Sequence, residues 1–310
     1  MFKMKKTIDI ICIGELLIDF IGNELNTPIS KIENYGRFLG GSPTNVSIYG
    51  SKLGLKTALV ASCGNDGLGH FMLEKLNENQ VITSCIHKID DQSSSVIFVS
   101  KSNETPEFIP YRQADYHITE AQLPDSLLQQ SKIFHTTCFA LSKNPARETI
   151  LKKAKKAYQL GLQTSIDLNY SDKIWPERTE AKEIIKEYLS TNPLVKLSDD
   201  DCFRWFNEIK SDDYIFDYFQ KQGASTICLT KGKNGVVIFD SKLGVITKKA
   251  NLVENIKDTT GAGDAFWTGF LYSKLKGKEL PECINTAQEL AGIKLQNIGE
   301  LPNNVQLREF

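Results

Sequence analysis

Short apolar runs alternate with longer mixed segments along most of the chain. The apolar runs, which predict buried strands, fall at residues 8–13, 57–63, 133–137, 163–168, 194–197, 226–230 and 235–239. Apolar residues at helical spacing predict helices at residues 44–53, 70–79, 147–160, 179–189, 212–221, 265–275 and 283–295. From about Thr44 onward, this alternation predicts an α/β fold with a doubly wound, mostly parallel sheet and helices on both faces. Ligands of such folds bind beyond the carboxyl ends of the strands.

Two stretches, residues 15–38 and 88–116, break this alternation. The first contains strand-like pieces but no helix. The second indicates a hairpin whose strands and turn fall at residues 95–100, 107–112 and 102–104. We expect both stretches to form a small β-sheet inserted into a single domain that covers residues 1–310. This sheet could be a lid beside the ligand edge or a hairpin with no moving role, and its exposed edge could pair two copies into a homodimer.

Composition narrows the classes of partner. The 37 basic and 38 acidic residues nearly cancel, so the chain lacks the charge excess of a protein that binds nucleic acid or an anionic membrane. Its seven cysteines are scattered and its four histidines form no zinc pattern, which favours reduced thiols and a cytoplasmic location. Acidic residues interrupt the apolar stretch 8–21, which favours a buried strand there over a signal peptide. No segment is long and apolar enough to predict a membrane span.

The sharpest chemical signal is residues 258–266, Asp-Thr-Thr-Gly-Ala-Gly-Asp-Ala-Phe, which precede a predicted helix. Gly261, Ala262 and Gly263 can turn tightly and aim backbone N–H groups at one point, where the helix adds its partial positive charge. Such a pocket suits a phosphoryl group. Asp264, at its lip, could accept the proton of an attacking hydroxyl, as phosphoryl transfer requires. The alternative is that Asp264 only caps the helix.

The full string resembles the DTxGAGDxF signature of the ribokinase-like (PfkB) carbohydrate kinase family. Residues 40–47, Gly-Gly-Ser-Pro-Thr-Asn-Val-Ser, followed by Leu-Gly at 53–54, resemble the GGxxxNxA region of the same family. The resemblance covers essentially the whole chain. It implies an α/β core with a β-lid over a sugar, and ATP with Mg²⁺ as cofactors. By the same resemblance, Gly40, Gly41 and Asn45 are expected to bind the sugar.

Other segments that resemble family motifs carry further candidates. Asp19 ends a segment, 14–19, that resembles the first-strand segment whose Asp chelates two sugar hydroxyls, and the two oxygens of a carboxylate suit a vicinal diol. Asp167 and Asn169 match the DxN beside the phosphate path and are expected at the substrate. Arg112 follows a tyrosine in the hairpin and could contact substrate, or it could be a solvated side chain.

The expected nucleotide and metal contacts also follow from the resemblance. Candidates for contact with ATP are Lys196, Ser198, Thr230, Gly232 and Gly235. Asp201 stands at the acidic position of an NxxE-like motif, where it would contact Mg²⁺ through bound water, and Asp200 could serve instead. Asp258 could help to hold a monovalent cation such as K⁺, or it could only stabilise its own turn.

Within this family, the sequence most resembles the fructokinases, and this resemblance implies that the chain converts D-fructose and ATP to fructose 6-phosphate and ADP. The alternative within the family is 2-keto-3-deoxygluconate kinase, whose acidic substrate calls for arginines. Ser171 stands where DxNxR members have Arg, which weakens that alternative. A sugar- or nucleotide-binding regulator without turnover is the alternative from another class.

Overall fold

The computed structural model describes residues 6–102 and 107–308. Its main sheet has nine strands in the order β13-β12-β11-β10-β9-β8-β1-β4-β5. Their bounds are β1 (Ile8–Ile13), β4 (Thr57–Gly64), β5 (Ile82–Ile89), β8 (Ser131–Thr137), β9 (Gln163–Asp167), β10 (Leu194–Ser198), β11 (Thr226–Thr230), β12 (Val236–Asp240) and β13 (Gly244–Lys248). All neighbours from β5 to β11 pair parallel, and β12 and β13 add antiparallel pairs at one edge.

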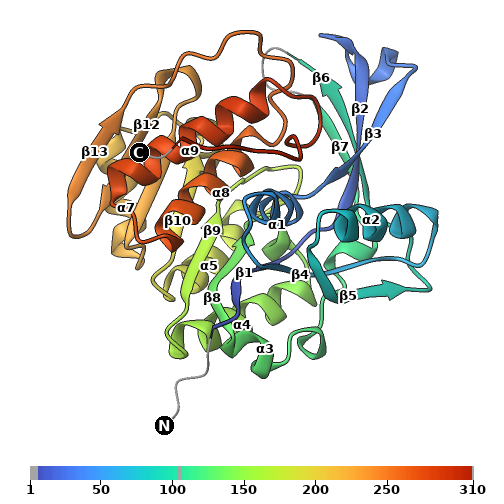
Figure 1. The fold of residues 1–310 in the computed structure, drawn as a ribbon, viewed down its shortest axis with the longest axis horizontal. Coiled ribbons are helices and arrows are strands. Elements are labelled where there is room, and N and C mark those ends of the chain that lie inside the picture. Colours follow the sequence, from blue (N-terminus) through green and yellow to red (C-terminus); the bar gives the residue numbers. More distant parts are fainter. Residues whose placement is uncertain (1–5, 103–106, 309–310) are drawn as a thin grey trace.

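Helices cover both faces of this sheet (Figure 1). One face packs on the helices α1 (Ser42–Lys52), α2 (Gly67–Glu78), α8 (Ala262–Leu275) and α9 (Leu280–Leu295). The other packs on α3 (Asp125–Gln129), α4 (Ala146–Gln159), α5 (Arg178–Leu189), α6 (Asp199–Phe206) and α7 (Asp212–Lys221). The apolar stripes of these helices and the apolar strands form two separate core clusters, one on each side. The predicted doubly wound fold is therefore confirmed.

A second, four-stranded sheet stands apart from the core, at the upper right of Figure 1. Its order is β3-β2-β6-β7, with bounds β2 (Leu17–Leu25), β3 (Tyr35–Gly40), β6 (Val96–Lys101) and β7 (Phe108–Tyr111). The predicted hairpin is present as the antiparallel pair β6 and β7. Of its predicted turn at 102–104, residues 103 and 104 lie outside the described residues.

The bounds of this small sheet differ from the prediction. On one side, β3 continues to Gly40, and a short 3₁₀ turn, Ile29–Lys31, interrupts a stretch predicted to have no helix. On the other side, residues 88 and 89 belong to β5 of the main sheet, and Ala114–Tyr116 form a 3₁₀ turn packed against β4. Only the middle of the second predicted stretch therefore enters the small sheet.

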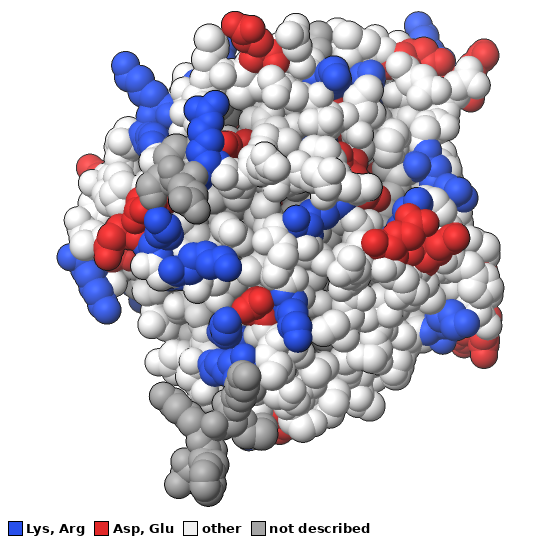
Figure 2. Space-filling model, in the orientation of Figure 1, with Lys and Arg blue, Asp and Glu red and all other residues white. Residues whose placement is uncertain are grey.

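Charge is mixed over the surface. On the face drawn in Figure 2, acidic and basic side chains are interspersed, which agrees with the nearly balanced count along the sequence. Within the described ranges, no helix is long and apolar enough to cross a membrane.

Candidate active site

The glycine loop leads directly into α8. Gly261 is the N-cap of that helix, with a φ of +73° that favours glycine. Asp264 is the third residue of the helix, so the alternative that Asp264 is the N-cap is wrong. The N–H of Ala262 donates to the Thr259 carbonyl at 3.2 Å, so a bound anion would compete with this turn for that donor.

Asp264 is held between α8 and the start of α1. Its Oδ1 accepts a hydrogen bond from Ser42 Oγ at 2.6 Å, and its Oδ2 accepts one from Asn45 Nδ2 at 2.8 Å. Burial raises the pKa of Asp264, and these two hydrogen bonds, followed by the charges of Lys196 and Lys294, oppose that rise. A carboxylate that is fixed in place and made more basic suits a general base. Sequence reasoning missed Ser42, although it lies inside the second motif.

Gly40 and Gly41 allow the chain to pass close to other atoms. A Cβ on Gly40 would overlap the Asp19 carboxyl group, and a Cβ on Gly41, where φ is +101°, would overlap the Glu15 carbonyl. Asp19 lies on β2 of the small sheet, and not on the first strand, where the family motif was expected to place it. Burial, together with the negative charges of Asp264 and Asp258, raises the pKa of Asp19 to about 7.

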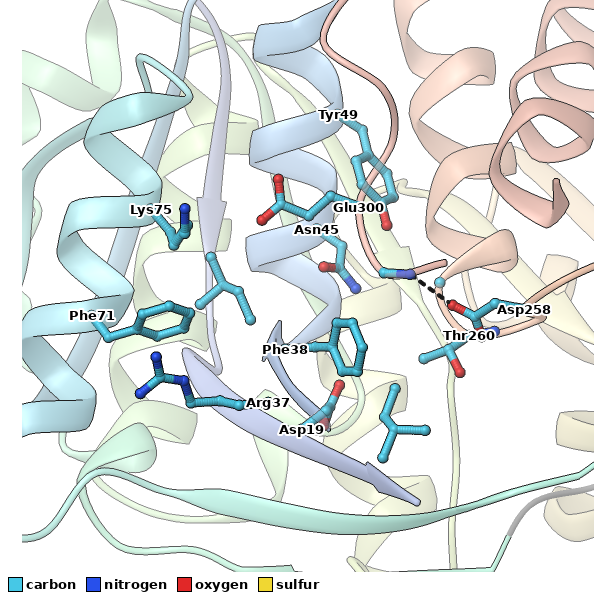
Figure 3. Close-up of a pocket in the computed structure, with 14 residues that line it drawn as sticks. Asp19, Arg37, Phe38, Asn45, Tyr49, Phe71, Lys75, Asp258, Thr260 and Glu300 are labelled. Carbon is cyan, nitrogen blue, oxygen red and sulfur yellow. Dashed lines mark hydrogen bonds between the residues drawn. The ribbon is translucent and has the colours of Figure 1, made fainter. Parts of the chain in front are cut away.

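Three of the predicted sugar and phosphate residues meet at a cavity of about 130 Å³. Asp19, Asn45 and Gly261 line it together with the aromatic rings of Phe38 and Tyr49 (Figure 3). In Figure 3, the ring of Phe38 lies between the side chains of Asn45 and Asp19. Phe38 was not predicted, because a single aromatic residue in an edge strand carries no sequence signal for a ligand.

Lys196 approaches the other side of the glycine loop. Its ammonium group pairs with Asp167 at 2.9 Å, and a Cβ on Gly263 would lie 2.9 Å from its Nζ. Burial works against the ammonium form, but the carboxylates of Asp167 and Asp201 outweigh it and raise the pKa of Lys196. A permanent positive charge therefore lies against the loop. Asn169, two residues beyond Asp167, accepts a hydrogen bond from the backbone N–H of Phe139 at 3.1 Å.

Ser198 and Asp201 form a capping box at the start of α6. Ser198 Oγ accepts from the Asp201 N–H at 3.0 Å, and Asp201 Oδ2 accepts from the Ser198 N–H at 2.9 Å. Asp201 Oδ1 accepts from Arg204 at 2.7 Å. Both oxygens of Asp201 are thus engaged, and its predicted contact with Mg²⁺ through bound water stays a prediction. Within the described residues, no group of three or more His, Cys, Asp or Glu side chains could hold a metal ion.

The candidate nucleotide residues Thr230, Gly232 and Gly235 surround the end of β11. Thr230 ends the strand, Gly232 begins a 3₁₀ turn, and Gly235 has a φ of +102° where a Cβ would overlap the Lys248 carbonyl. The tight turn explains these glycines without a ligand, and their contact with the nucleotide stays a prediction.

A groove of about 450 Å³ lies farther along, between α9 and the segment after β13. Leu252, Val253, Asn285 and Gln288 are among its lining residues. Asn285 Oδ1 and Gln288 Oε1 are buried acceptors with no hydrogen-bond partner among the described residues. Unpaired buried acceptors are costly, so these two oxygens can accept a hydrogen bond from a water molecule or from a ligand in the groove. Sequence reasoning missed both, because lone amides on a helix carry no signal.

Arg112 is not the solvated side chain of the alternative interpretation. Its guanidinium makes two hydrogen bonds to Asp115 Oδ2, at 2.9 and 2.7 Å, and lies 4.1 Å from the centre of the Phe139 ring. It also lines a cavity of about 310 Å³ together with Lys143 and Lys173. No acidic side chain lines this cavity within the described part of the chain, and because Asp115 offsets the charge of Arg112, its positive charge comes from Lys143 and Lys173.

The small sheet connects the two cavities. In the register of its strands, Asp19 pairs with Phe38 and Ile97, and Ile97 pairs with Pro110. Paired residues of neighbouring strands share a face, so one row runs from the first cavity, at Asp19, to the positive cavity, at Pro110.

Asp258 was expected to hold a monovalent cation or to stabilise a turn. The turn is present, since Asp258 Oδ1 accepts from the Thr260 N–H at 2.9 Å. The other oxygen pairs with the ammonium group of Lys294 at 3.0 Å. No sequence pattern singled out Lys294, because a lysine near the end of a helix normally indicates a solvated position.

A doubly wound sheet, a glycine loop at a helix N-terminus and a buried carboxylate beside that loop are the features expected of an enzyme that transfers a phosphoryl group to a hydroxyl. The pfkB family carbohydrate kinase profile matches residues 7–305, so the chain belongs to this family of kinases. The ATP-dependent 6-phosphofructokinase of Thermoanaerobacterium thermosaccharolyticum is 33% identical over 297 residues, which cover 96% of this chain and 90% of that protein.

Solved structures agree with this assignment. The fructokinase of Halothermothrix orenii is 30% identical with a TM-score of 0.78, over 93% of this chain and 98% of that chain. A sugar kinase of Pyrococcus horikoshii in complex with ATP is 28% identical with a TM-score of 0.80, over 94% of this chain and 93% of that chain.

Proposed function

We propose that the chain transfers the γ-phosphoryl group of ATP to a terminal hydroxyl of D-fructose, giving fructose 6-phosphate and ADP. The observation that carries this proposal is the position of Asp264. It lies in the first turn of α8, beside the glycine loop, and two donors from α1 fix its carboxylate. The similarity to the H. orenii fructokinase supports fructose as the acceptor.

In this proposal, the sugar binds under the small sheet. Asp19 accepts hydrogen bonds from two sugar hydroxyls, Asn45 contacts another, and Gly40 and Gly41 allow the ring to approach the backbone. The small sheet acts as a lid that excludes water from the reaction, which limits hydrolysis of ATP. We propose that the sheet is part of one domain covering the whole chain.

Asp264 takes the proton of the attacking hydroxyl, and the oxygen attacks the γ-phosphorus in line. The N–H groups at Gly261–Gly263 and the ammonium group of Lys196 stabilise the negative charge that develops. Mg²⁺, which the family implies, would bind to the ATP phosphates and offset their charge. Asp167 holds Lys196 against the loop.

The adenine base of ATP would bind in the groove beside α9. Its exocyclic amino group can donate to the unpaired oxygens of Asn285 or Gln288, and Leu252, whose side chain is 90% exposed, offers an apolar contact. The phosphates would then extend toward the glycine loop, past the residues at the end of β11.

The test is ADP release from ATP and Mg²⁺ with fructose, ribose, glucose, tagatose, adenosine and 2-keto-3-deoxygluconate. We expect fructose to give the strongest signal. Asp264→Asn should lower kcat by about 10²–10⁴-fold, the usual contribution of a general base, and leave sugar affinity nearly unchanged. The exposed variant Asp213→Asn is the matched control. Near-normal turnover of Asp264→Asn would remove Asp264 from the role of base.

A second candidate acceptor is a ketose that already carries a phosphate, such as fructose 6-phosphate. The positive cavity of Arg112, Lys143 and Lys173 favours it, because this cavity lies at the far end of the row that begins at Asp19. The 6-phosphofructokinase of T. thermosaccharolyticum also supports it. Lys173→Met should raise the KM for fructose 6-phosphate by about tenfold, the loss of one charge-assisted contact, and leave the KM for fructose unchanged. An equal effect on both would argue against the second candidate.

A further inference from the structure

Both carboxylate oxygens of Asp258 are already engaged by protein donors. Its Oδ1 accepts from the Thr260 N–H, and its Oδ2 accepts from the Gly299 N–H at 3.1 Å and from Lys294 Nζ at 3.0 Å. The ammonium group carries the single positive charge that K⁺ would bring. The residues present therefore do not fit a K⁺ site built on the Asp258 carboxylate.

Lys294 is a buried residue of α9, with only 1% of its side chain exposed. Besides Asp258, its ammonium group donates to the Asn297 carbonyl oxygen at 3.2 Å. A carboxylate and a carbonyl are the hard oxygen ligands that a monovalent cation would use. Burial of a lysine is unfavourable unless such partners are present, so this position is built for a positive charge.

The ammonium group joins segments that shape the anion site. It connects α9 to Asp258, whose other oxygen fixes the turn at Thr260, directly before Gly261. The lysine stem also approaches the loop, since a Cβ on Gly261 would lie 3.6 Å from Lys294 Cε. On the opposite side, Lys196 Nζ lies against Gly263. The glycine loop is thus bracketed by two buried lysines that are far apart in sequence.

We propose that the ammonium group of Lys294 takes the place of a bound monovalent cation. Lys294 is a positioning residue that fixes the shape and charge of the glycine loop, and phosphoryl transfer is therefore independent of K⁺. This inference rests on the proposed function, because the loop is taken as the phosphoryl site. It concerns the positioning of the loop, since Lys294 donates to the Asp258 carboxylate and the Asn297 carbonyl, with two of its three protons engaged there.

The first experiment uses the unaltered enzyme. ADP release is measured in KCl, NaCl and tetramethylammonium chloride at equal ionic strength. We expect kcat to differ between these salts by no more than about twofold, the size of a general salt effect. Strong activation by K⁺ would overturn the proposal.

The second experiment removes the charge. Lys294→Ala should lower kcat by about 100-fold through misplacement of the loop, with the KM for sugar little changed. K⁺ should restore part of this loss by entering the vacated position, whereas the larger tetramethylammonium should not. Lys294→Arg should retain more activity than Lys294→Ala. Wild-type kcat in Lys294→Ala, or a loss that no small cation reduces, would contradict the proposal.

Lys52→Ala is the matched control. Lys52 Nζ also pairs with a carboxylate and a carbonyl oxygen, those of Glu300 at 3.2 Å and Leu301 at 2.5 Å, and its side chain is 6% exposed. It does not contact the glycine loop, so its loss should lower the melting temperature without producing rescue of kcat by K⁺. Rescue of both variants alike would show a general effect of salt on stability and would overturn the proposal.

Melting temperatures test the role of Lys294 independently of the proposed kinase activity. If no sugar in the panel is phosphorylated, the proposed function fails, but the cation position can still be tested. K⁺ should then raise the melting temperature of Lys294→Ala more than tetramethylammonium does, and should raise neither that of the wild type nor that of Lys52→Ala. If Lys294→Ala does not fold, the salt series on the wild type and on Lys294→Arg decides.

Discussion

At the residue scale, Asp19 and Asp264 are two carboxyl groups of one site, and the charge of Asp264 affects the protonation of Asp19. In the role that we propose, both oxygens of Asp19 accept hydrogen bonds from sugar hydroxyls, which requires the ionised form, yet burial and the negative charge of Asp264 raise the pKa of Asp19 to about 7. Burial also raises the pKa of Asp264, and its two hydrogen-bond donors and the nearby lysines oppose that rise. The free site therefore favours a proton on Asp19, which sugar binding would release.

The pKa of Asp19 predicts how the stability of the free enzyme depends on pH. Asp19 binds its proton up to about pH 7 in the folded chain, but only up to about its ordinary value of 3.8 when unfolded. The folded state therefore holds the extra proton, and the free energy of unfolding should fall as pH rises through this window. Above it, both states are ionised and this contribution stops changing.

Asp19→Asn should flatten the fall in stability, measured as the free energy of unfolding in urea between pH 4 and 7 at several pH values. A remaining fall up to about pH 8 is expected from Glu15, whose pKa burial raises to about 8. Calorimetry of sugar binding near neutral pH should also detect proton release in the wild type and less of it in the variant. An unchanged stability profile in Asp19→Asn would show that Asp19 is ionised in the free enzyme.

At the scale of elements, the site depends on where α1 begins. The turn from β3 into α1 passes through Gly41, whose φ of +101° and close approach to the Glu15 carbonyl exclude a side chain. This turn aims both Ser42 and Asn45 at Asp264. A change at Gly41 should therefore affect stability and catalysis together.

Gly41→Ala should lower the free energy of unfolding by about 1–3 kcal/mol from backbone strain, with an additional loss from the overlap with the Glu15 carbonyl, and should lower kcat. Gly54→Ala is the matched control, because Gly54 also has a positive φ, of +82°, but no atom lies within 4 Å of the added Cβ. Gly54→Ala should lower the free energy of unfolding by about 1–2 kcal/mol, through backbone strain alone, and should leave kcat unchanged. Equal kcat in both variants would argue that the start of α1 does not position the base.

The hydrophobic pattern predicted the elements that bury a continuous apolar face, such as β4, all of whose residues are buried. It missed β13, whose residues are exposed or half-buried, and β5, most of whose residues are also exposed or half-buried. It also missed α6, which begins with three aspartates. These elements form through sheet pairing or capping, which a one-dimensional pattern of hydrophobicity does not record.

For the site, local motifs predicted the residues whose role lies within one loop, such as Gly261 and Asp264. They did not predict residues whose role depends on distant partners. Lys294 reaches Asp258 across 36 positions of sequence, and Ser42 reaches Asp264 across 222. For Arg112, contact with substrate stays a prediction, and its ion pair with Asp115, at a spacing of three residues, was not predicted.

On the scale of the whole molecule, β3 and β7 are the edge strands of the small sheet among the described residues. Near the β7 edge, Ile109 and Tyr111 are 37% and 56% exposed, and the Tyr111 ring packs edge-on against Phe98 at 6.0 Å. A free edge beside exposed apolar side chains favours pairing with another copy. We propose a homodimer that associates through this sheet.

Light scattering after size exclusion tests the dimer. We expect a mass twice the 34.8 kDa of one chain. Ile109→Lys should shift the mass to that of one chain, because a lysine would bring an unpaired charge into the contact. Leu243→Lys is the matched control: Leu243 is 58% exposed but lies in the turn between β12 and β13, far from the small sheet in sequence and fold. A wild type of 34.8 kDa would contradict the dimer, and dissociation by Leu243→Lys would move the contact to the opposite edge of the molecule. If the sheet is both a lid and a contact, Ile109→Lys should also raise the KM for sugar, because a lid strand that loses its partner is ordered by the substrate alone.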